Sequence, residues 1–186
     1  MRIIAGTFRS RPLTAPAGEA TRPTSDKLRG ALFNILTAAG MVEGKRFLDL
    51  YAGSGAVGIE AISRGAAHSV LVENDKLALR ALHSNLKSLG ITREATVLER
   101  DVTNALHELQ SLSRFNVVFL DPPWKEEKAY QQTLEKISPG LLVDAQSTVI
   151  AEHEKHFDPE DKIGLLHRVR IHKQGDAVLS FYRMVE

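Results

Sequence analysis

Residues 49–58, Asp-Leu-Tyr-Ala-Gly-Ser-Gly-Ala-Val-Gly, are the stretch that decides the fold. The apolar run at 47–50 leads into three glycines, and apolar residues at helical spacing follow in 56–62. This order predicts a strand, a tight glycine turn and a helix. Glycine permits a positive φ and lets a ligand approach the main chain, and the helix N-terminus offers unpaired N–H groups. We therefore expect the turn to hold a nucleotide-like ligand.

The spacing of the glycines leaves the kind of ligand open. Gly53, Gly55 and Gly58 match G-x-G-x-x-G, the fingerprint of dinucleotide-binding folds. A similar glycine turn holds S-adenosylmethionine in methyltransferases, and such a turn can also serve helix packing alone. The turn by itself does not choose among these three roles.

The composition is that of an ordinary soluble globular protein. The 186 residues are 43% hydrophobic and 25% charged, which suits one domain with a small appendage. Cysteine is absent, which excludes disulfides and thiolate metal sites and is compatible with a reducing cytosol. The sequence shows neither a signal peptide nor a membrane span. We expect a cytoplasmic protein with no membrane or metal partner.

Positive charge is concentrated at the N-terminus. The whole chain has a net charge of only +1, but residues 1–30 hold six basic and two acidic side chains, a local charge of +4. A basic arm on a mildly acidic body is a candidate footprint for an anionic polymer, although a solvated tail would have the same composition. The basic residues are Arg2, Arg9, Arg11, Arg22, Lys27 and Arg29.

Residues 1–43 are expected to form a basic N-terminal unit. The loosely alternating residues 1–16 predict a short β-hairpin or an extended arm. Apolar residues at 28, 31, 32, 35 and 36 predict an amphipathic helix, which starts after the capping residues Thr24 and Ser25.

Strands and helices alternate in residues 44–186. The predicted strands are 47–50, 69–73, 95–98, 116–120 and 148–151. The predicted helices are 56–64, 75–89, 103–112 and 127–137. Such alternation predicts a parallel sheet covered by helices on both faces. The last two predicted strands, 166–172 and 177–184, flank a turn at Gly175 and predict an antiparallel hairpin.

Acidic residues stand at the ends of four successive predicted strands. They are Asp49, Glu73, Asp101 and Asp121. Because ligands bind at the carboxyl ends of strands in an open α/β sheet, these acids are expected to form a polar rim around the glycine turn. Glu73 lies twenty residues past Gly53, the spacing at which a carboxylate binds ribose hydroxyls. Asp101 suits an adenine amino group and Asp49 a cationic ligand end, directly or through water, although each could instead cap a helix or stabilise a turn.

The motif Asp121-Pro122-Pro123-Trp124 predicts the catalytic site. Two prolines fix a stiff turn after a buried strand and hold an acid and an aromatic ring in place. The Asp121 carboxylate and the Pro122 carbonyl can accept both hydrogens of an exocyclic amine, which would orient its lone pair and stabilise the charge that develops on nitrogen. Trp124 offers a face on which a base can stack, a contact worth about 1–3 kcal/mol. A structural proline turn with a core Trp is the alternative.

The glycine turn, the acids and the proline motif together resemble class I S-adenosylmethionine-dependent amino-methyltransferases, whose signature is Asn/Asp-Pro-Pro-aromatic. More narrowly, residues 1–6, MRIIAG, and 21–36, TRPTSDKLRGALFNIL, resemble the bacterial 16S ribosomal RNA guanine-N2 methyltransferase family. The resemblance runs along nearly the whole chain. It implies a Rossmann-like fold with a mostly parallel seven-stranded sheet, whose last strand is antiparallel. Trp124 stands where the family often has Phe or Tyr, which keeps an aromatic face but alters the pocket shape.

This resemblance implies methyl transfer from S-adenosylmethionine to the N2 amine of a guanine in 16S rRNA, free or in the small subunit. The base would be flipped into the Asp-Pro-Pro-Trp pocket, and the six basic residues would contact phosphates. Residues 44–186 would be the methyltransferase domain of a monomer, and Gly58 would serve helix packing. The donor would be held by Asp49, Gly53, Gly55, Glu73 and Asp101.

Three alternatives remain open. An amino-methyltransferase acting on DNA adenine or on a protein glutamine would use the same motif. An NAD-dependent oxidoreductase would use the glycines and Glu73 but leaves the proline motif unexplained. A non-catalytic RNA-binding module would explain the arm but not the acids. Metal catalysis is not expected, because His153 and His156 lack a partner set and should lie at the surface.

Overall fold

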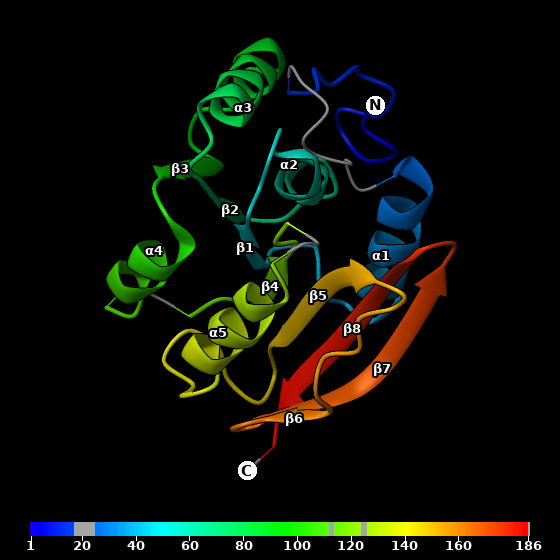
Figure 1. The fold of residues 1–186 in the computed structure, drawn as a ribbon. Coiled ribbons are helices and arrows are strands. Elements are labelled where there is room, and N and C mark those ends of the chain that lie inside the picture. The colour runs from blue at the N-terminus through cyan, green and yellow to red at the C-terminus, as the bar shows by residue number, and fades with distance from the viewer. Residues whose placement is uncertain (17–24, 112–113, 124–125, 186) are drawn as a thin grey trace.

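The computed structural model describes residues 1–16, 25–111, 114–123 and 126–185 (Figure 1). The helices are α1 (Asp26–Ala38), α2 (Ala56–Ser63), α3 (Lys76–Leu89), α4 (Val102–Leu109) and α5 (Glu127–Ile137). The strands are β1 (Arg46–Leu50), β2 (His68–Glu73), β3 (Ala95–Glu99), β4 (Val117–Leu120), β5 (Thr148–Glu154), β6 (Lys162–Ile163), β7 (Leu166–Gln174) and β8 (Ala177–Met184).

One sheet joins all the strands in the order β3-β2-β1-β4-β5-β8-β7-β6. Strands β1 to β5 pair in parallel, and β8 pairs antiparallel with both β5 and β7. Helices lie on both faces (Figure 1). These features confirm the predicted Rossmann-like methyltransferase fold with its C-terminal hairpin. The sheet has eight strands rather than seven, because the two-residue strand β6 pairs with the start of β7.

Alternate residues of the central strands face opposite layers of the core. Leu48 and Leu120 belong to the apolar cluster that contains α4 and α5 residues, whereas Phe47 and Phe119 belong to the cluster that contains Phe33 of α1. Because both faces are covered, the central strands are mostly apolar, as is typical of parallel sheets, and the polar exceptions such as Asp49 on β1 are buried. The strand order reverses between β1 and β4, which is where ligands bind in this class of fold.

The N-terminal arm, residues 1–16, is packed onto the domain. Its two halves are joined by an antiparallel bridge between Arg2 and Pro12, so the arm is a hairpin-like loop instead of a regular β-hairpin. Ile3 and Leu13 are buried in an apolar cluster with residues of α2 and α3. Gly6 has a φ of +85°, and a Cβ there would lie 1.7 Å from the Ser63 carbonyl oxygen. The division of the chain at residues 43 and 44 stays a prediction.

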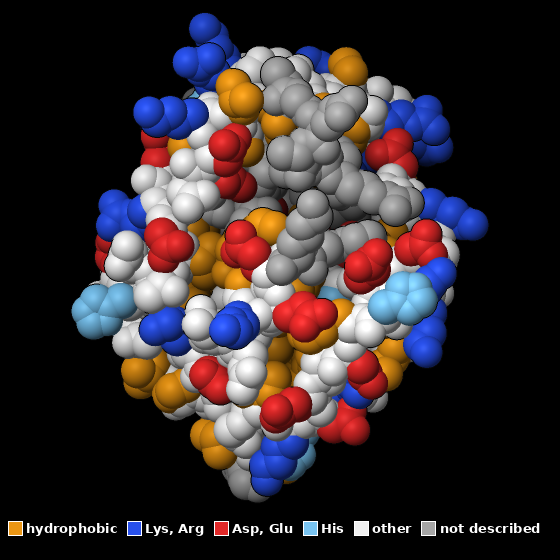
Figure 2. Space-filling view, in the orientation of Figure 1, with side chains coloured by type: hydrophobic (Ala, Val, Ile, Leu, Met, Phe, Trp, Pro, Cys, Tyr) orange, Lys and Arg blue, Asp and Glu red, His pale blue; other side chains and the backbone are white. Residues whose placement is uncertain are grey.

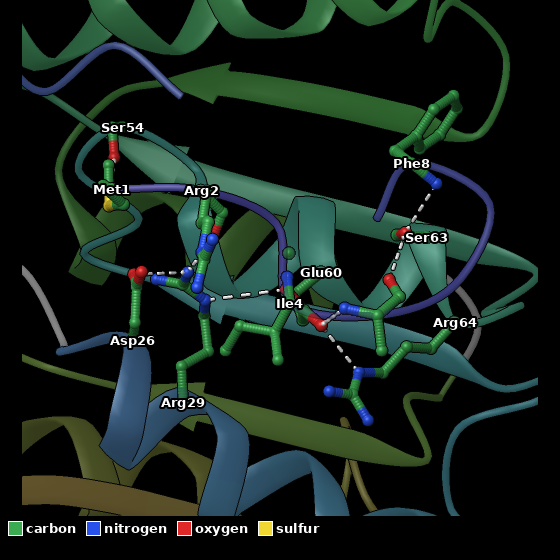
Figure 3. Close-up of polar contacts among 12 residues, drawn as sticks. Met1, Arg2, Ile4, Phe8, Asp26, Arg29, Ser54, Glu60, Ser63 and Arg64 are labelled. Atoms are coloured by element: carbon green, nitrogen blue, oxygen red, sulfur yellow. Dashed lines mark hydrogen bonds and ion pairs between the residues drawn. The ribbon is translucent and has the colours of Figure 1, made fainter. Parts of the chain in front are cut away.

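Glu60, on α2, is the polar anchor of the arm (Figure 3). Its carboxylate is fully buried and accepts hydrogen bonds from the main-chain N–H groups of Ile4 (2.8 Å) and Ala5 (3.1 Å). It also accepts one from Arg64 Nε at 2.7 Å, and Arg29 Nε lies 3.7 Å away. A buried carboxylate is stable only with such partners, so Glu60 ties the arm and α1 to α2.

The prediction that Arg29 contacts RNA phosphates is wrong for this structure. The Arg29 side chain has no exposed surface and donates to Asp26 Oδ1 at 3.0 Å and to the carbonyl oxygen of Arg2. Together with Glu60, these acceptors hold the guanidinium beneath the arm, where it can stabilise the fold but cannot reach a polymer outside (Figure 3).

Candidate functional site

The structure brings the four predicted acids to the carboxyl edge of the parallel strands. Asp49 lies near the end of β1, and Glu73 is the last residue of β2. Asp101 follows β3 as the residue before α4, and Asp121 directly follows β4. The in-register pairing of β1 with both β2 and β4 places the glycine turn and Asp121 side by side at this edge.

The glycine turn after β1 has the left-handed backbone that the sequence predicted. Gly53 and Gly55 have φ values of 57° and 80°, and Tyr51 has a φ of 61°. Among the described residues, no atom lies within 4 Å of a Cβ built at Gly53, so these residues leave the space beside it open to a ligand. A Cβ at Gly55 would lie 2.3 Å from Leu82 Cδ1, so any side chain at that position would force the buried Leu82 to move. Gly55 also caps α2, which begins at Ala56.

Substituting Gly55 should therefore destabilise the turn. For Gly55→Ala we expect a loss of about 2–4 kcal/mol, because a left-handed residue costs about 1–2 kcal/mol and overpacking a core about 1–3 kcal/mol. Urea unfolding measures this loss. Gly53→Ala is the matched control for stability, because it has the same backbone strain without the clash. Equal losses in the two variants would contradict the packing argument.

Glu73 accepts hydrogen bonds from the main chain of the glycine turn and from the main chain that follows β2. Its Oε2 accepts from Gly53 N–H at 2.8 Å, and its Oε1 accepts from the N–H groups of Asn74 and Asp75, each at 2.8 Å. The side chain therefore holds the glycine turn against the end of β2. Its predicted contact with a ribose stays a prediction.

Asp49 is buried beneath the glycine turn. It is 1% exposed, and its Oδ2 accepts from Gly58 N–H at 2.8 Å. Burial raises the pKa of Asp49 to about 7, and the nearby Glu73 and Glu152 carboxylates add to the rise. A Cβ at Gly58 would lie 2.7 Å from Ser69 Oγ, in agreement with a packing role for this glycine. The predicted contact of Asp49 with a cationic ligand stays a prediction.

Asp101 caps α4 in this structure. Its Oδ1 accepts from the N–H groups of Thr103 (2.8 Å) and Asn104 (3.4 Å), the geometry of an N-cap. The residue is exposed at the same edge as Glu73. Its predicted contact with an adenine amino group stays a prediction.

The start of the proline motif is anchored to the core. Pro122 is buried, and its carbonyl oxygen accepts from the Tyr130 hydroxyl at 3.2 Å. Asp121 is half-buried beside it, and its N–H donates to the Leu50 carbonyl at 3.4 Å. Trp124, the predicted stacking residue, lies outside the described residues, as does Arg22.

Two tyrosines near this edge were missed by sequence reasoning. Burial raises the pKa of Tyr130, and the Asp121 carboxylate adds to the rise, so the hydroxyl stays protonated and donates to Pro122. Burial likewise raises the pKa of Tyr51, whose hydroxyl lies 2.9 Å from Thr133 Oγ1. The only sequence signal for Tyr51 was its place next to the glycines, and Tyr130 reads as an ordinary core residue of a helix.

Four of the predicted RNA-contacting residues are exposed on the arm and at the start of α1: Arg2, Arg9, Arg11 and Lys27. Arg2, Arg9 and Lys27 line a surface hollow of about 410 Å³, together with Ser10 and Asp26. Figure 2 shows acidic side chains around the middle of the face in view and Lys and Arg side chains mostly toward its periphery. The face in view is therefore mixed in charge, and Arg2, Arg9 and Lys27 form a basic site at the arm.

The expectation that His153 lies at the surface is wrong. It is 2% exposed on β5, with Nε2 2.9 Å from Ser180 Oγ and Nδ1 3.0 Å from the Glu154 carbonyl, and burial lowers its pKa. His156 is exposed. Among the described residues, no three His, Cys, Asp or Glu side chains gather as a metal site. Within the same ranges, no helix is long and apolar enough to cross a membrane.

The similarity of this chain to known proteins, in sequence and in structure, covers most or nearly all of its length. A Bacillus subtilis (strain 168) protein, provisionally named rRNA methyltransferase YlbH, is 37% identical over 184 residues, 98% of each chain. A Haemophilus influenzae protein named ribosomal RNA small subunit methyltransferase D is 35% identical over 156 residues, 83% of this chain and 79% of that protein. The solved structure of an Escherichia coli protein, provisionally named methyltransferase yhhF, has a TM-score of 0.84 at 31% identity and covers 99% of this chain and 97% of its own.

The family model described as "Conserved hypothetical protein 95" matches residues 1–183. Its match includes both the glycine turn and the proline motif. The chain therefore belongs to this family, and the resemblance to methyltransferases that its motifs indicated is confirmed.

Proposed function

We propose that this protein transfers a methyl group from S-adenosylmethionine to the N2 amine of a guanine in 16S rRNA. The observation that carries the proposal is the placement of the open glycine turn and the Asp121–Pro122 turn side by side at one sheet edge. The relatives named as rRNA methyltransferases support RNA as the substrate. We expect the protein to act as a monomer in the bacterial cytoplasm.

The residues of the edge fit a positively charged nucleoside such as S-adenosylmethionine. Gly53 leaves the main chain accessible, and carboxylates at Glu73 and Asp101 suit a ribose and an adenine amine. Asp49 is a buried carboxylate whose ionisation a cationic ligand would favour. When bound, S-adenosylmethionine supplies an electrophilic methyl group and a neutral sulfur leaving group.

The Asp121–Pro122 turn would orient the amine of a flipped guanine. The Pro122 carbonyl already accepts one hydrogen bond from Tyr130 and has a second lone pair for an amine hydrogen. The Asp121 carboxylate would accept the other hydrogen and stabilise the positive charge that develops on nitrogen. Trp124 would supply the stacking surface. The amine nitrogen would form the new N–C bond as the S–C bond of the donor breaks, and would then release one proton to water.

The arm would hold the RNA. Arg2, Arg9, Arg11 and Lys27 are exposed and would bind phosphates, and we add Arg22 from the sequence alone. The hollow lined by Arg2, Arg9 and Lys27 is a candidate seat for one phosphate of the backbone. Such contacts would make RNA affinity fall steeply with salt.

The proposal is tested by mapping methylated nucleotides in 16S rRNA from cells with and without this protein. The expected result is loss of one N2-methylguanine. In vitro, purified protein and labelled donor should label 16S rRNA or small subunits and leave duplex DNA and protein unlabelled. Labelling of DNA adenine or of a protein glutamine would instead support the alternative amino-methyltransferases.

Asp49 should make donor binding depend on pH. Because its pKa is about 7, the carboxyl is mostly protonated at about pH 6. A cationic donor binds the ionised form better, so we expect affinity to rise by up to about tenfold between about pH 6 and about pH 8. Calorimetry with S-adenosylmethionine measures the change. Asp49→Asn keeps an acceptor for Gly58 and controls for titration of the donor itself, so an equal pH dependence in that variant would contradict the assignment.

A further inference from the structure

Asn85, on α3, connects the N-terminal arm to the glycine turn. Its Nδ2 donates to the Ser54 carbonyl and to the Thr14 carbonyl, each at 3.0 Å. Its Oδ1 accepts from Thr14 N–H at 2.8 Å. The side chain is 1% exposed, so these bonds are sheltered from water. One amide thus binds two main-chain segments that are far apart in sequence.

The bonds use the full donor capacity of the Asn85 amide. Both Nδ2 hydrogens and one Oδ1 lone pair are engaged with main-chain groups. Ser54 lies between Gly53 and Gly55, so its carbonyl sets the orientation of the peptide plane in the middle of the turn. If position 85 served packing alone, an apolar side chain would suffice there. The neighbouring α3 residues Leu82 and Leu86 pack in this way in the apolar cluster.

Other contacts make the arm and the turn one mechanical unit. Met1 Sδ lies 4.0 Å from Ser54 Oγ (Figure 3). Ile3 and Leu13 share an apolar cluster with Ala56, the first residue of α2. Glu60 holds the arm to the same helix. A displacement of the arm would therefore displace the turn, and Asn85 forms hydrogen bonds with both.

We propose that Asn85 is a positioning residue that couples RNA binding on the arm to donor binding at the turn. The inference rests on the proposed function. RNA contacts to Arg2, Arg9 and Arg11 favour the arrangement in which the arm packs on α2 and α3. In that arrangement Thr14 binds the Asn85 amide and so orients it toward the Ser54 carbonyl. A donor in the turn favours the same arrangement from the other side. Two ligands that favour one state strengthen each other's binding by the same factor.

The test measures both affinities with and without the other ligand. S-adenosylhomocysteine replaces the donor so that no transfer occurs, and 16S rRNA is the second ligand. Calorimetry gives the affinity for S-adenosylhomocysteine, and filter binding gives the affinity for RNA. In the wild type we expect each ligand to tighten the other about fivefold. In Asn85→Leu, which is close in volume, the factor should fall below about twofold, because only the apolar contacts, the Met1–Ser54 contact and Glu60 would still link the arm to the turn and α2.

Two further variants make the outcome specific. Ser84→Leu, at an exposed position of α3, should keep the fivefold coupling. Thr14→Pro removes the N–H that donates to Asn85 Oδ1 and leaves the interior of α3 unchanged. It therefore tests the contact between the arm and Asn85 even if Asn85→Leu does not fold. It should lower the coupling as well. Coupling that stays at about fivefold in a folded Asn85→Leu or in Thr14→Pro would overturn the inference.

The binding measurements on the wild-type protein distinguish failure of this inference from failure of the proposed function on which it rests. Independent binding of both ligands would overturn the coupling and leave the proposed function standing. Failure to bind either ligand would overturn both.

Discussion

Replacing Asp121 with alanine should slow methyl transfer about 100- to 1,000-fold while the affinity for S-adenosylmethionine changes less than about twofold. The magnitude is that of removing one preorganised group that stabilises charge in the transition state. Donor affinity should persist because the turn that would hold it is built by β1, α2 and Glu73, not by Asp121. Single-turnover kinetics with 16S rRNA measure the rate, and calorimetry measures donor binding.

Two variants make this prediction specific. Asp121→Asn keeps an acceptor but loses the charge, so its rate should lie between those of the wild type and Asp121→Ala. Glu94→Ala removes an exposed acid just before β3, at the opposite edge of the sheet, and should leave the rate unchanged. If Asp121→Ala retains the wild-type rate, this carboxylate has no part in the mechanism.

Replacing Glu60 with alanine should lower the free energy of unfolding by about 3–5 kcal/mol. Removing one partner of a buried ion pair typically costs that much, and Arg29 would keep its contacts with Asp26 and the Arg2 carbonyl but lose the buried carboxylate. Here the loss would leave Arg29 without its buried carboxylate and the N–H groups of Ile4 and Ala5 without their acceptor. Urea unfolding at neutral pH measures the loss.

The matched control for Glu60 is Glu43→Ala, because Glu43 is an exposed acid. It should change stability by less than about 0.5 kcal/mol. The arm should also be looser in Glu60→Ala, so RNA affinity should fall together with stability. A loss below about 1 kcal/mol would show that Glu60 does not anchor the arm.

The sequence predicted the architecture well because both faces of the sheet are covered. Mostly apolar strands and helices with apolar residues at helical spacing then mark the central elements, and α5 spans the predicted residues 127–137. The strand β6 could not be predicted, since two residues carry no pattern. The same double coverage explains why His153 is buried: on a central strand such as β5, neither face is exposed.

The site was only partly predictable. Strand-end acids and the glycine turn could be located, because topology alone brings the carboxyl ends of parallel strands together. The hydrogen-bond partners of these acids could not be assigned from the sequence. Glu73 binds Gly53, and Asp101 caps α4, through contacts that depend on side-chain direction.

Arg29 was predicted to be exposed because its buried partner could not be seen in the sequence. Its place beside the arm suggested an exposed cation, yet it shares helical spacing with Phe33 and Leu36 on the buried face of α1. The carboxylate that receives it, Glu60, lies on another helix. Charge alone therefore did not reveal that this side chain points inward.

The docked arm also bears on the order in which the chain acquires its structure. Ile4 binds a carboxylate 56 positions further along, and Thr14 binds an amide 71 positions further along. During synthesis, the arm therefore leaves the ribosome long before α2 and α3 exist to receive it. Contacts of such long sequence separation form slowly, so the arm, which is made before the helices that receive it, should be among the last segments to reach its native place.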